Sequence, residues 1–231
     1  MPKRILCFGD SNTFGWIGSL EGPTHRFPSD VRWTGRLATL LGPDCEIIEE
    51  GLGGRTLRDN FTVGSGVFVP GAGLCGKDYL PASLLSHLPL DAVVIMLGSN
   101  DMKSALNRSE HDIAEGMAEL ADIVLTFPWQ ELLDYPRPRL LIVSPPLIGE
   151  RKMALAGERY VDAPRKSRAL AALYKDVAER RNAFFLDAAS YLTDEPAGEA
   201  HGPDGMHLTE RDHEKLALGI AEKLKEMLCI S

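Results

Sequence analysis

The feature that most constrains the fold is an alternation of two hydrophobic patterns along the chain. Short apolar runs rich in β-branched residues have the length and composition of buried strands. They occupy residues 5–8, 45–48, 92–97, 140–143 and 184–186. Between them, apolar residues at three- and four-residue spacing are typical of helices, at residues 33–41, 82–88, 113–127, 169–181 and 211–228. This alternation predicts right-handed βαβ units and an α/β fold: a three-layer α/β/α sandwich with a mainly parallel five-stranded sheet.

Length and composition narrow the domain organisation and the class of partner. No linker divides the 231 residues, so we expect one domain over residues 1–231. The formal net charge of −8 disfavours nucleic-acid binding, which depends on basic patches. We expect no membrane association, because no apolar stretch approaches the roughly 18 residues of a span and no signal peptide is evident. The four cysteines form no CxxC pair, which predicts reduced thiols in a cytoplasmic protein.

Polar motifs follow four of the five predicted strands. They read Gly-Asp-Ser-Asn at 9–12, Gly-Leu-Gly-Gly at 51–54, Gly-Ser-Asn-Asp at 98–101 and Asp-Gly-Met-His at 204–207. In a parallel sheet the reactive groups gather at the carboxyl ends of the strands. A serine hydroxyl becomes an effective nucleophile beside an imidazole that takes its proton and an acid that orients the imidazole. The motifs contain this set.

Hydrolysis of an acyl group also requires hydrogen-bond donors for the oxyanion that forms on the carbonyl oxygen. The chain offers three candidates: the backbone N–H of Ser11, the backbone N–H of Gly54 and the side-chain amide of Asn100. Glycine allows substrate to approach the backbone closely, and an amide donates without titrating. The predicted chemistry therefore requires no cofactor and no metal.

The four motifs resemble those of the SGNH, or GDSL, hydrolase family, which are GDS, Gly, GxND and DxxH in the same order along the chain. The resemblance implies a catalytic triad of Ser11 as nucleophile, His207 as general base and Asp204 as the partner that orients His207. It also implies that Gly54 and Asn100 contribute to the oxyanion hole with Ser11.

Further segments, at residues 30–35, 48–52 and 95–98, are similar to the aryl esterase and acyltransferase branch of this family. The resemblance implies a serine esterase that acts on short-chain acyl or aryl esters of small molecules. It also implies acyl transfer to alcohols or peroxide, and assembly into a homo-oligomer. The chain departs from the branch at Asn12, where Leu is usual, and at Gly53–Gly54, where bulkier residues are usual. These departures bear on transfer selectivity and leave the triad unaffected.

Other residues beside the motifs are candidates for supporting roles. We expect Asp10 and Asp101 to form structural hydrogen bonds. Candidates for an apolar wall around the acyl or aryl group are Phe14, Trp16 and Met206. Candidates for contacts to a polar or anionic acyl group are Arg26, Arg55 and Lys103.

Several alternatives stay open at this level. A carbohydrate acetyl esterase or a thioesterase would use the same triad, because residues 58–78 and 149–162 carry no binding signature. Residues 71–76 fit the GxGxxG pattern of dinucleotide-binding proteins, but the short apolar run before them ends in Pro70, which disfavours dinucleotide binding.

His201, Asp204 and His207 are a possible metal site, although a triad explains two of them. A flavodoxin-like binding module is the non-enzymatic alternative, and the apolar residues 67–70 would suit an interface between subunits.

Overall fold

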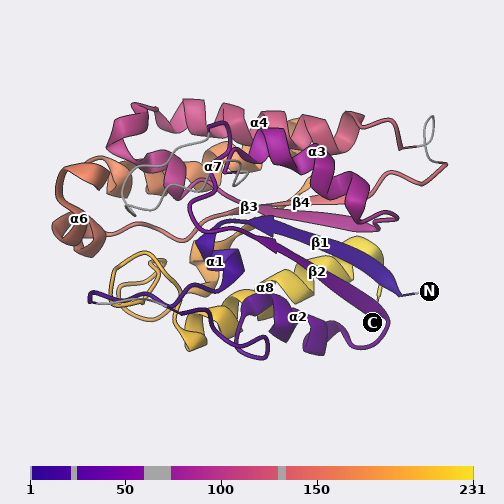
Figure 1. The fold of residues 1–231 in the computed structure, drawn as a ribbon, viewed down its shortest axis with the longest axis horizontal. Coiled ribbons are helices and arrows are strands. Elements are labelled where there is room, and N and C mark those ends of the chain that lie inside the picture. Colours follow the sequence, from indigo (N-terminus) through magenta and orange to yellow (C-terminus); the bar gives the residue numbers. More distant parts are fainter. Residues whose placement is uncertain (1, 22–24, 60–73, 130–133, 231) are drawn as a thin grey trace.

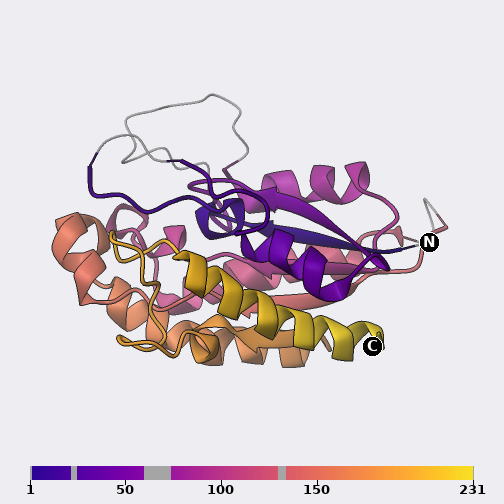
Figure 2. The same ribbon diagram turned by 90° about the horizontal axis from the view of Figure 1, so that it is seen from below.

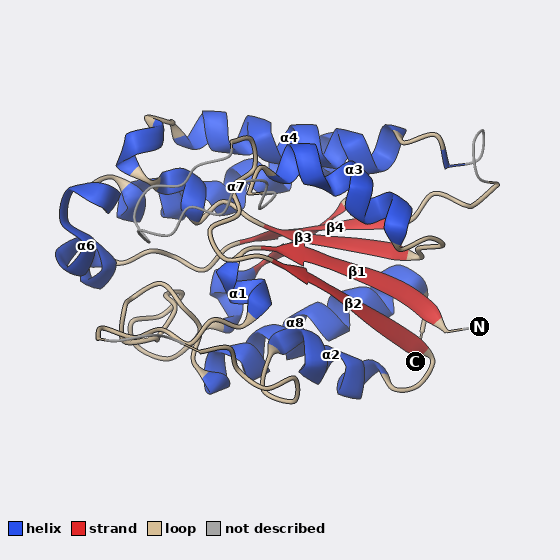
Figure 3. Cartoon of the chain, viewed as in Figure 1, coloured by secondary structure: helices blue, strands red, loops and turns tan. Residues whose placement is uncertain are grey.

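The computed structural model describes residues 2–21, 25–59, 74–129 and 134–230. A sheet with helices on both faces organises these residues (Figure 1, Figure 3). Its strands are β1 (Lys3–Gly9), β2 (Cys45–Gly51), β3 (Ala92–Met96), β4 (Arg139–Ser144) and β5 (Phe184–Asp187). Their order is β2-β1-β3-β4-β5, and each neighbouring pair is parallel. The predicted three-layer α/β/α fold is confirmed.

Two groups of helices cover the two faces of the sheet. Helices α2 (Trp33–Leu41) and α8 (Glu210–Leu228) lie on one face, and α3 (Gly76–Ser86), α4 (Glu110–Thr126) and α7 (Ala163–Arg180) lie on the other (Figure 1). Each face has its own hydrophobic core. Along β1, Leu6 and Phe8 contribute to one core, while Ile5 and Cys7 contribute to the other. Because successive side chains of a strand point to opposite faces, a strand that is covered on both faces is apolar throughout.

Short helices and turns shape the end of the sheet where the strands finish. They are α1 (Ser11–Phe14), α6 (Glu150–Ala156) and the 3₁₀ helices η1 (Asn100–Met102), η2 (Ser104–Leu106), η3 (Gly157–Tyr160) and η4 (Ala188–Tyr191). This end lies away from both chain termini (Figure 2). The motifs that follow β1, β2 and β3 therefore meet on one side of the molecule.

The helix-start signals in the sequence agree with the structure. Pro164 lies in the first turn of α7, where its missing N–H has no intrahelical partner to lose. Thr209 caps α8 in a reciprocal capping box with Asp212. The sequence missed α1 and α6, which are too short to show a helical period, and it placed the start of α3 six residues late, after Pro81.

Some features of the sequence remain outside this description. The apolar residues 67–70 and the first three residues of the GxGxxG match lie outside the described residues. All four cysteines are free thiols. None of the described helices combines the length and apolar character needed to cross a membrane.

Candidate active site

The three predicted triad residues lie in one hydrogen-bonded line. Ser11 is the first residue of α1, directly after β1, and its Oγ lies 3.0 Å from Nε2 of His207. Nδ1 of His207 lies 2.6 Å from Oδ2 of Asp204. An ionised carboxylate only accepts hydrogen bonds, so Nδ1 carries the proton and Nε2 is free to accept the Ser11 hydroxyl proton. The backbone N–H groups of Met206 and His207 donate to the other oxygen of Asp204, at 3.2 and 3.1 Å.

The electrostatics of Asp204 favour its charged form. Burial acts to raise the pKa of this carboxyl, but the hydrogen bonds from His207 and the positive charge of Lys152 outweigh it and hold the pKa well below its usual range. Asp204 is therefore an anion across the pH range in which an esterase works. In the predicted triad, an anion at this position would orient the imidazole of His207 and stabilise the imidazolium that forms during catalysis.

The strand-to-helix turn that presents Ser11 is fixed by its neighbour Asp10. The Asp10 carboxylate accepts the backbone N–H of Asn12 at 2.9 Å and so caps α1. Burial raises the pKa of Asp10 to about 6, against opposing hydrogen-bond and charge effects. Its contacts are those of a structural residue, as the sequence predicted.

Asn12 contacts the loop that carries His207. Its Nδ2 donates to the carbonyl of Met206 at 3.1 Å, and its Oδ1 accepts the backbone N–H of Leu208 at 3.1 Å. One buried side chain thus binds the backbone on both sides of His207 and ties it to the helix that begins with Ser11. The sequence marked Asn12 only as a departure from the family pattern, because its partners lie 194 and 196 residues further along the chain.

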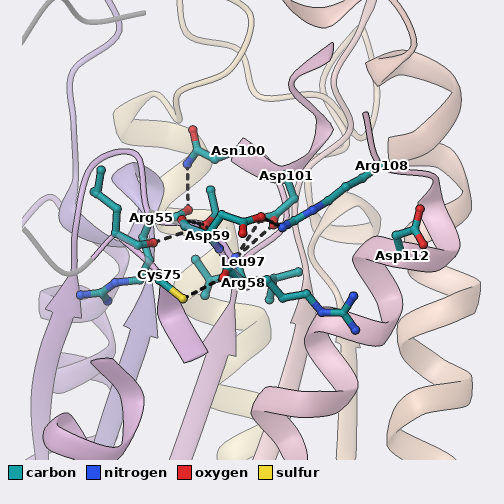
Figure 4. Close-up of polar contacts among 12 residues, drawn as sticks. Arg55, Arg58, Asp59, Cys75, Leu97, Asn100, Asp101, Arg108 and Asp112 are labelled. Carbon is teal, nitrogen blue, oxygen red and sulfur yellow. Dashed lines mark hydrogen bonds and ion pairs between the residues drawn. The ribbon is translucent and has the colours of Figure 1, made fainter. Parts of the chain in front are cut away.

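The oxyanion-hole candidates converge from three strand ends. Nδ2 of Asn100 donates to the backbone carbonyl of Arg55 at 3.1 Å (Figure 4), which leaves its second amide hydrogen for a ligand. Gly54 has φ +85°, a left-handed conformation that favours glycine. The backbone N–H groups of Gly54 and Ser11 have no acceptor among the described residues. These strand ends therefore offer two backbone N–H groups and one amide hydrogen to a ligand.

A second network fixes the position of the turn after β2. The carboxylate of Asp101 accepts the backbone N–H of Leu57 at 3.1 Å and pairs with Arg108, which also contacts Asp59 (Figure 4). This network joins the chain that follows β2 to the chain that follows β3. Asp101 has the structural contacts that the sequence predicted for it.

The candidate wall residues have different surroundings. Trp16 is 37% exposed, and its ring centroid lies 6.4 Å from that of His207. A Cβ added to Gly53 would come within 3.7 Å of the Trp16 ring, so Trp16 lies between the oxyanion turn and His207. Phe14 packs beside Trp16, at 6.1 Å between ring centroids, whereas Met206 is buried in the core. Of the three candidates, Trp16 is the one that is exposed next to His207.

The arginine candidates have structural partners. Arg55 is fully buried, donates to the carbonyl of Gly9 at 3.1 Å and lies over the ring of Phe8 at 4.1 Å. Arg26 donates to a backbone carbonyl and pairs with Glu49 at 3.2 Å. Neither is needed to explain binding of an acyl group.

The metal-site alternative is not supported. Nδ1 of His201 lies 2.5 Å from the carboxylate of Asp212, and its Nε2 lies 3.2 Å from the carbonyl of Asp194. The partners of the His201 ring are thus Asp212 and Asp194, not Asp204 or His207. Among the described residues, no group of three or more His, Cys, Asp or Glu side chains is arranged to hold a metal ion.

Comparisons with known proteins agree with this geometry. The family model for GDSL-like lipases and acylhydrolases matches residues 7–215. The chain belongs to the GDSL-like lipase/acylhydrolase family. It is therefore a serine ester hydrolase of the kind that the sequence motifs indicated. A comparison with curated protein sequences gives no match.

Several solved structures are similar over nearly the whole chain. The aryl esterase of M. smegmatis is 40% identical, with a TM-score of 0.86 and coverage of 97% of this chain and 99% of that one. A carbohydrate acetylesterase from Sinorhizobium meliloti is 38% identical, with a TM-score of 0.83 and the same coverage. A putative arylesterase from Agrobacterium tumefaciens str. C58 is 30% identical, with a TM-score of 0.78 and again the same coverage.

Proposed function

We propose that this chain hydrolyses short-chain acyl or aryl esters through an acyl-enzyme on Ser11. The observation that carries the proposal is the line from Asp204 through His207 to Ser11, with contacts of 2.6 and 3.0 Å, next to backbone and amide donors. Nucleophile, base, orienting acid and oxyanion donors are the parts that acyl transfer through serine requires.

The mechanism has two steps. Ser11 Oγ attacks the ester carbonyl carbon while its proton passes to Nε2 of His207, and the oxyanion accepts hydrogen bonds from the N–H groups of Ser11 and Gly54 and from Asn100. The C–O bond to the alcohol then breaks, and the alcohol leaves with the proton from His207. Water attacks the acyl-enzyme with His207 again as base, which releases the acid and restores Ser11.

The aromatic ring beside His207 supports aryl and short acyl esters as substrates. Trp16 lies beside His207, and the glycines of the oxyanion turn leave room for a substrate next to it. An alcohol or peroxide in place of water would give acyl transfer, which we include in the proposal. Carbohydrate acetyl ester hydrolysis is the second candidate, because an acetylesterase is 38% identical over the full chain. Homo-oligomeric assembly and a cytoplasmic location stay predictions from the sequence.

Release of p-nitrophenol from its acetate, butyrate and octanoate esters tests the proposal, with wild type and Ser11→Ala compared with and without added alcohol. We expect activity that falls with chain length and is lost in Ser11→Ala, and a new ester where alcohol transfer occurs. A folded Ser11→Ala variant with full activity would overturn the nucleophile assignment. Activity on sugar acetates alone would favour the second candidate.

A further inference from the structure

Helix α6 packs closely on the turn that carries the triad acid and base. Gly205, between Asp204 and His207, has φ +66°, and a Cβ there would come within 2.9 Å of the backbone nitrogen of Lys152 in α6. Only glycine leaves space for this approach without strain. Arg151 and Lys152, in a segment that shows no binding signature in the sequence, thus lie against the turn that carries Asp204 and His207.

This packing places a lysine beside the triad acid. Nζ of Lys152 lies 3.6 Å from Oδ2 of Asp204, the same oxygen that lies 2.6 Å from Nδ1 of His207. The side chains of Lys152 and Asp204 are 13% and 14% exposed, so solvent screens their interaction only in part. The Lys152 ammonium also lies over the ring of Tyr160, at 5.5 Å from its centroid. Aromatic and carboxylate contacts hold the ammonium at this position.

Other charges act on the same group. Asp204 is the negative charge next to Lys152, while Arg159 on η3 and Lys103 after η1 add positive charge. Burial lowers the pKa of Lys152, and the attraction of Asp204 opposes that effect. The negative charge of Asp204 is therefore divided between an ammonium and an imidazole.

We propose that Lys152 is a positioning residue for the triad acid. Its ammonium holds the Asp204 carboxylate in place, and through Asp204 it keeps the imidazole of His207 in line with Ser11. This inference rests on the proposed role of Ser11, His207 and Asp204.

The test compares Lys152→Met, Lys152→Arg and a matched control, Arg151→Met, which removes an exposed charge from the same helix. The rate at which a fluorophosphonate labels Ser11 is measured, together with kcat and KM for p-nitrophenyl acetate and the urea midpoint of unfolding. In Lys152→Met we expect the labelling rate and kcat to fall by about 10-fold at unchanged KM and unfolding midpoint, because the triad acid loses the contact that aligns it. Lys152→Arg keeps the charge and should restore both rates toward those of wild type, and Arg151→Met should match wild type.

The outcomes separate this inference from the function on which it rests. A Lys152→Met enzyme with the labelling rate and kcat of wild type, or a loss that Lys152→Arg fails to restore, would overturn the inference. Wild-type protein that neither reacts with the fluorophosphonate at Ser11 nor hydrolyses esters would instead overturn the proposed function.

Discussion

Two histidine–aspartate pairs lie within one short stretch of this chain, and their geometries differ in one respect. Nδ1 of His207 lies 2.6 Å from Asp204, and Nδ1 of His201 lies 2.5 Å from Asp212. The other ring nitrogen of His207 faces the Ser11 hydroxyl at 3.0 Å, whereas that of His201 faces a backbone carbonyl at 3.2 Å. A hydroxyl can donate to a neutral imidazole, but a carbonyl can only accept.

This difference separates the proposed base, His207, from a histidine that is held between two acceptors, His201. Both nitrogens of His201 face acceptors, so its contacts favour the protonated ring. Burial acts to lower the pKa of His201, but the bond to Asp212 outweighs burial and raises it above the ordinary value. A histidine–aspartate pair is thus not by itself a catalytic signature. The partner of the far nitrogen decides the role.

The His201–Asp212 pair fixes the loop that carries Asp204 and His207. Asp212 is fully buried and accepts the backbone N–H groups of His201, at 3.0 Å, and Thr209, at 2.8 Å. The chain between these two donors contains Asp204 and His207. The His201–Asp212 pair therefore fixes both ends of the triad loop against α8.

The largest expected effect is a difference in activity between variants of the two histidine–aspartate pairs. His207→Gln should lower kcat on p-nitrophenyl acetate by about 10⁴-fold or more, since it removes the base. His201→Gln should leave kcat within a few-fold, because it touches only the loop. Ser11→Ala combined with His207→Gln should be no worse than either alone, as triad members act as a unit. An inactive but folded His201→Gln enzyme would contradict the separation of roles.

The predicted oxyanion donors also distinguish the two histidine–aspartate pairs. They should matter only for catalysis by the His207–Asp204 pair, which faces the Ser11 hydroxyl. Asn100→Ala should lower kcat by about 100- to 1000-fold, on the order of 3 kcal/mol, with little change in KM. Steady-state kinetics on p-nitrophenyl acetate give both constants. A rise in KM at constant kcat would show instead that Asn100 binds the ground state and the transition state equally.

Asp212→Asn should act on folding and leave the chemistry intact. It weakens the acceptor of a buried network, so the free energy of unfolding should fall by about 1–3 kcal/mol. Asp204→Asn is the matched variant, and it should cost activity far more than stability. Urea unfolding and kcat of both proteins check this. Equal losses of activity in the two variants would remove the distinction between the pairs.

Asn12→Leu tests how the triad loop is held from the nucleophile side. The variant restores the residue usual in the branch but loses the hydrogen bonds to Met206 and Leu208. We expect kcat to fall by about 10-fold, or about 1.4 kcal/mol, as His207 becomes less well aligned with Ser11. Asn12→Asp keeps the bond to Leu208 but sets a carboxylate oxygen against the Met206 carbonyl, so its kcat should be no higher than that of Asn12→Leu. Unchanged kinetics in Asn12→Leu would show that the loop is aligned without Asn12.

The smallest effect concerns the pH dependence of folding stability. The pKa of His201 is raised in the folded protein, so its contribution is fully present below the unfolded value of 6.5 and is lost as pH rises through the folded pKa. The stability gap between wild type and His201→Gln should shrink from pH 5.5 to pH 9, by on the order of 1 kcal/mol, for this pair of a 16% exposed histidine and a buried aspartate. Urea unfolding at both values, with the exposed His111→Gln as control, measures it. A gap that widens with pH would reverse the assignment.

Local sequence determined where the strands of the central sheet lie along the chain. Strands covered on both faces must be apolar throughout, so five runs marked the sheet without any knowledge of its partners. Parallel order then placed whatever follows each strand at one edge. Ser11, Gly54 and Asn100 were candidates because each lies within a few residues of a strand end, and His207 and Asp204 because they share a short motif.

Tertiary structure alone decided how those groups are supported. The contacts of Asn12 with the His207 loop, of Lys152 with Asp204 and of Asn100 with Arg55 join segments that share no periodic pattern. Periodicity reports only which face of an element is buried, and α6 is too short even for that. Which nitrogen of a histidine meets a hydroxyl, and which meets a carbonyl, depends on how loops from different strands pack at one edge of the sheet.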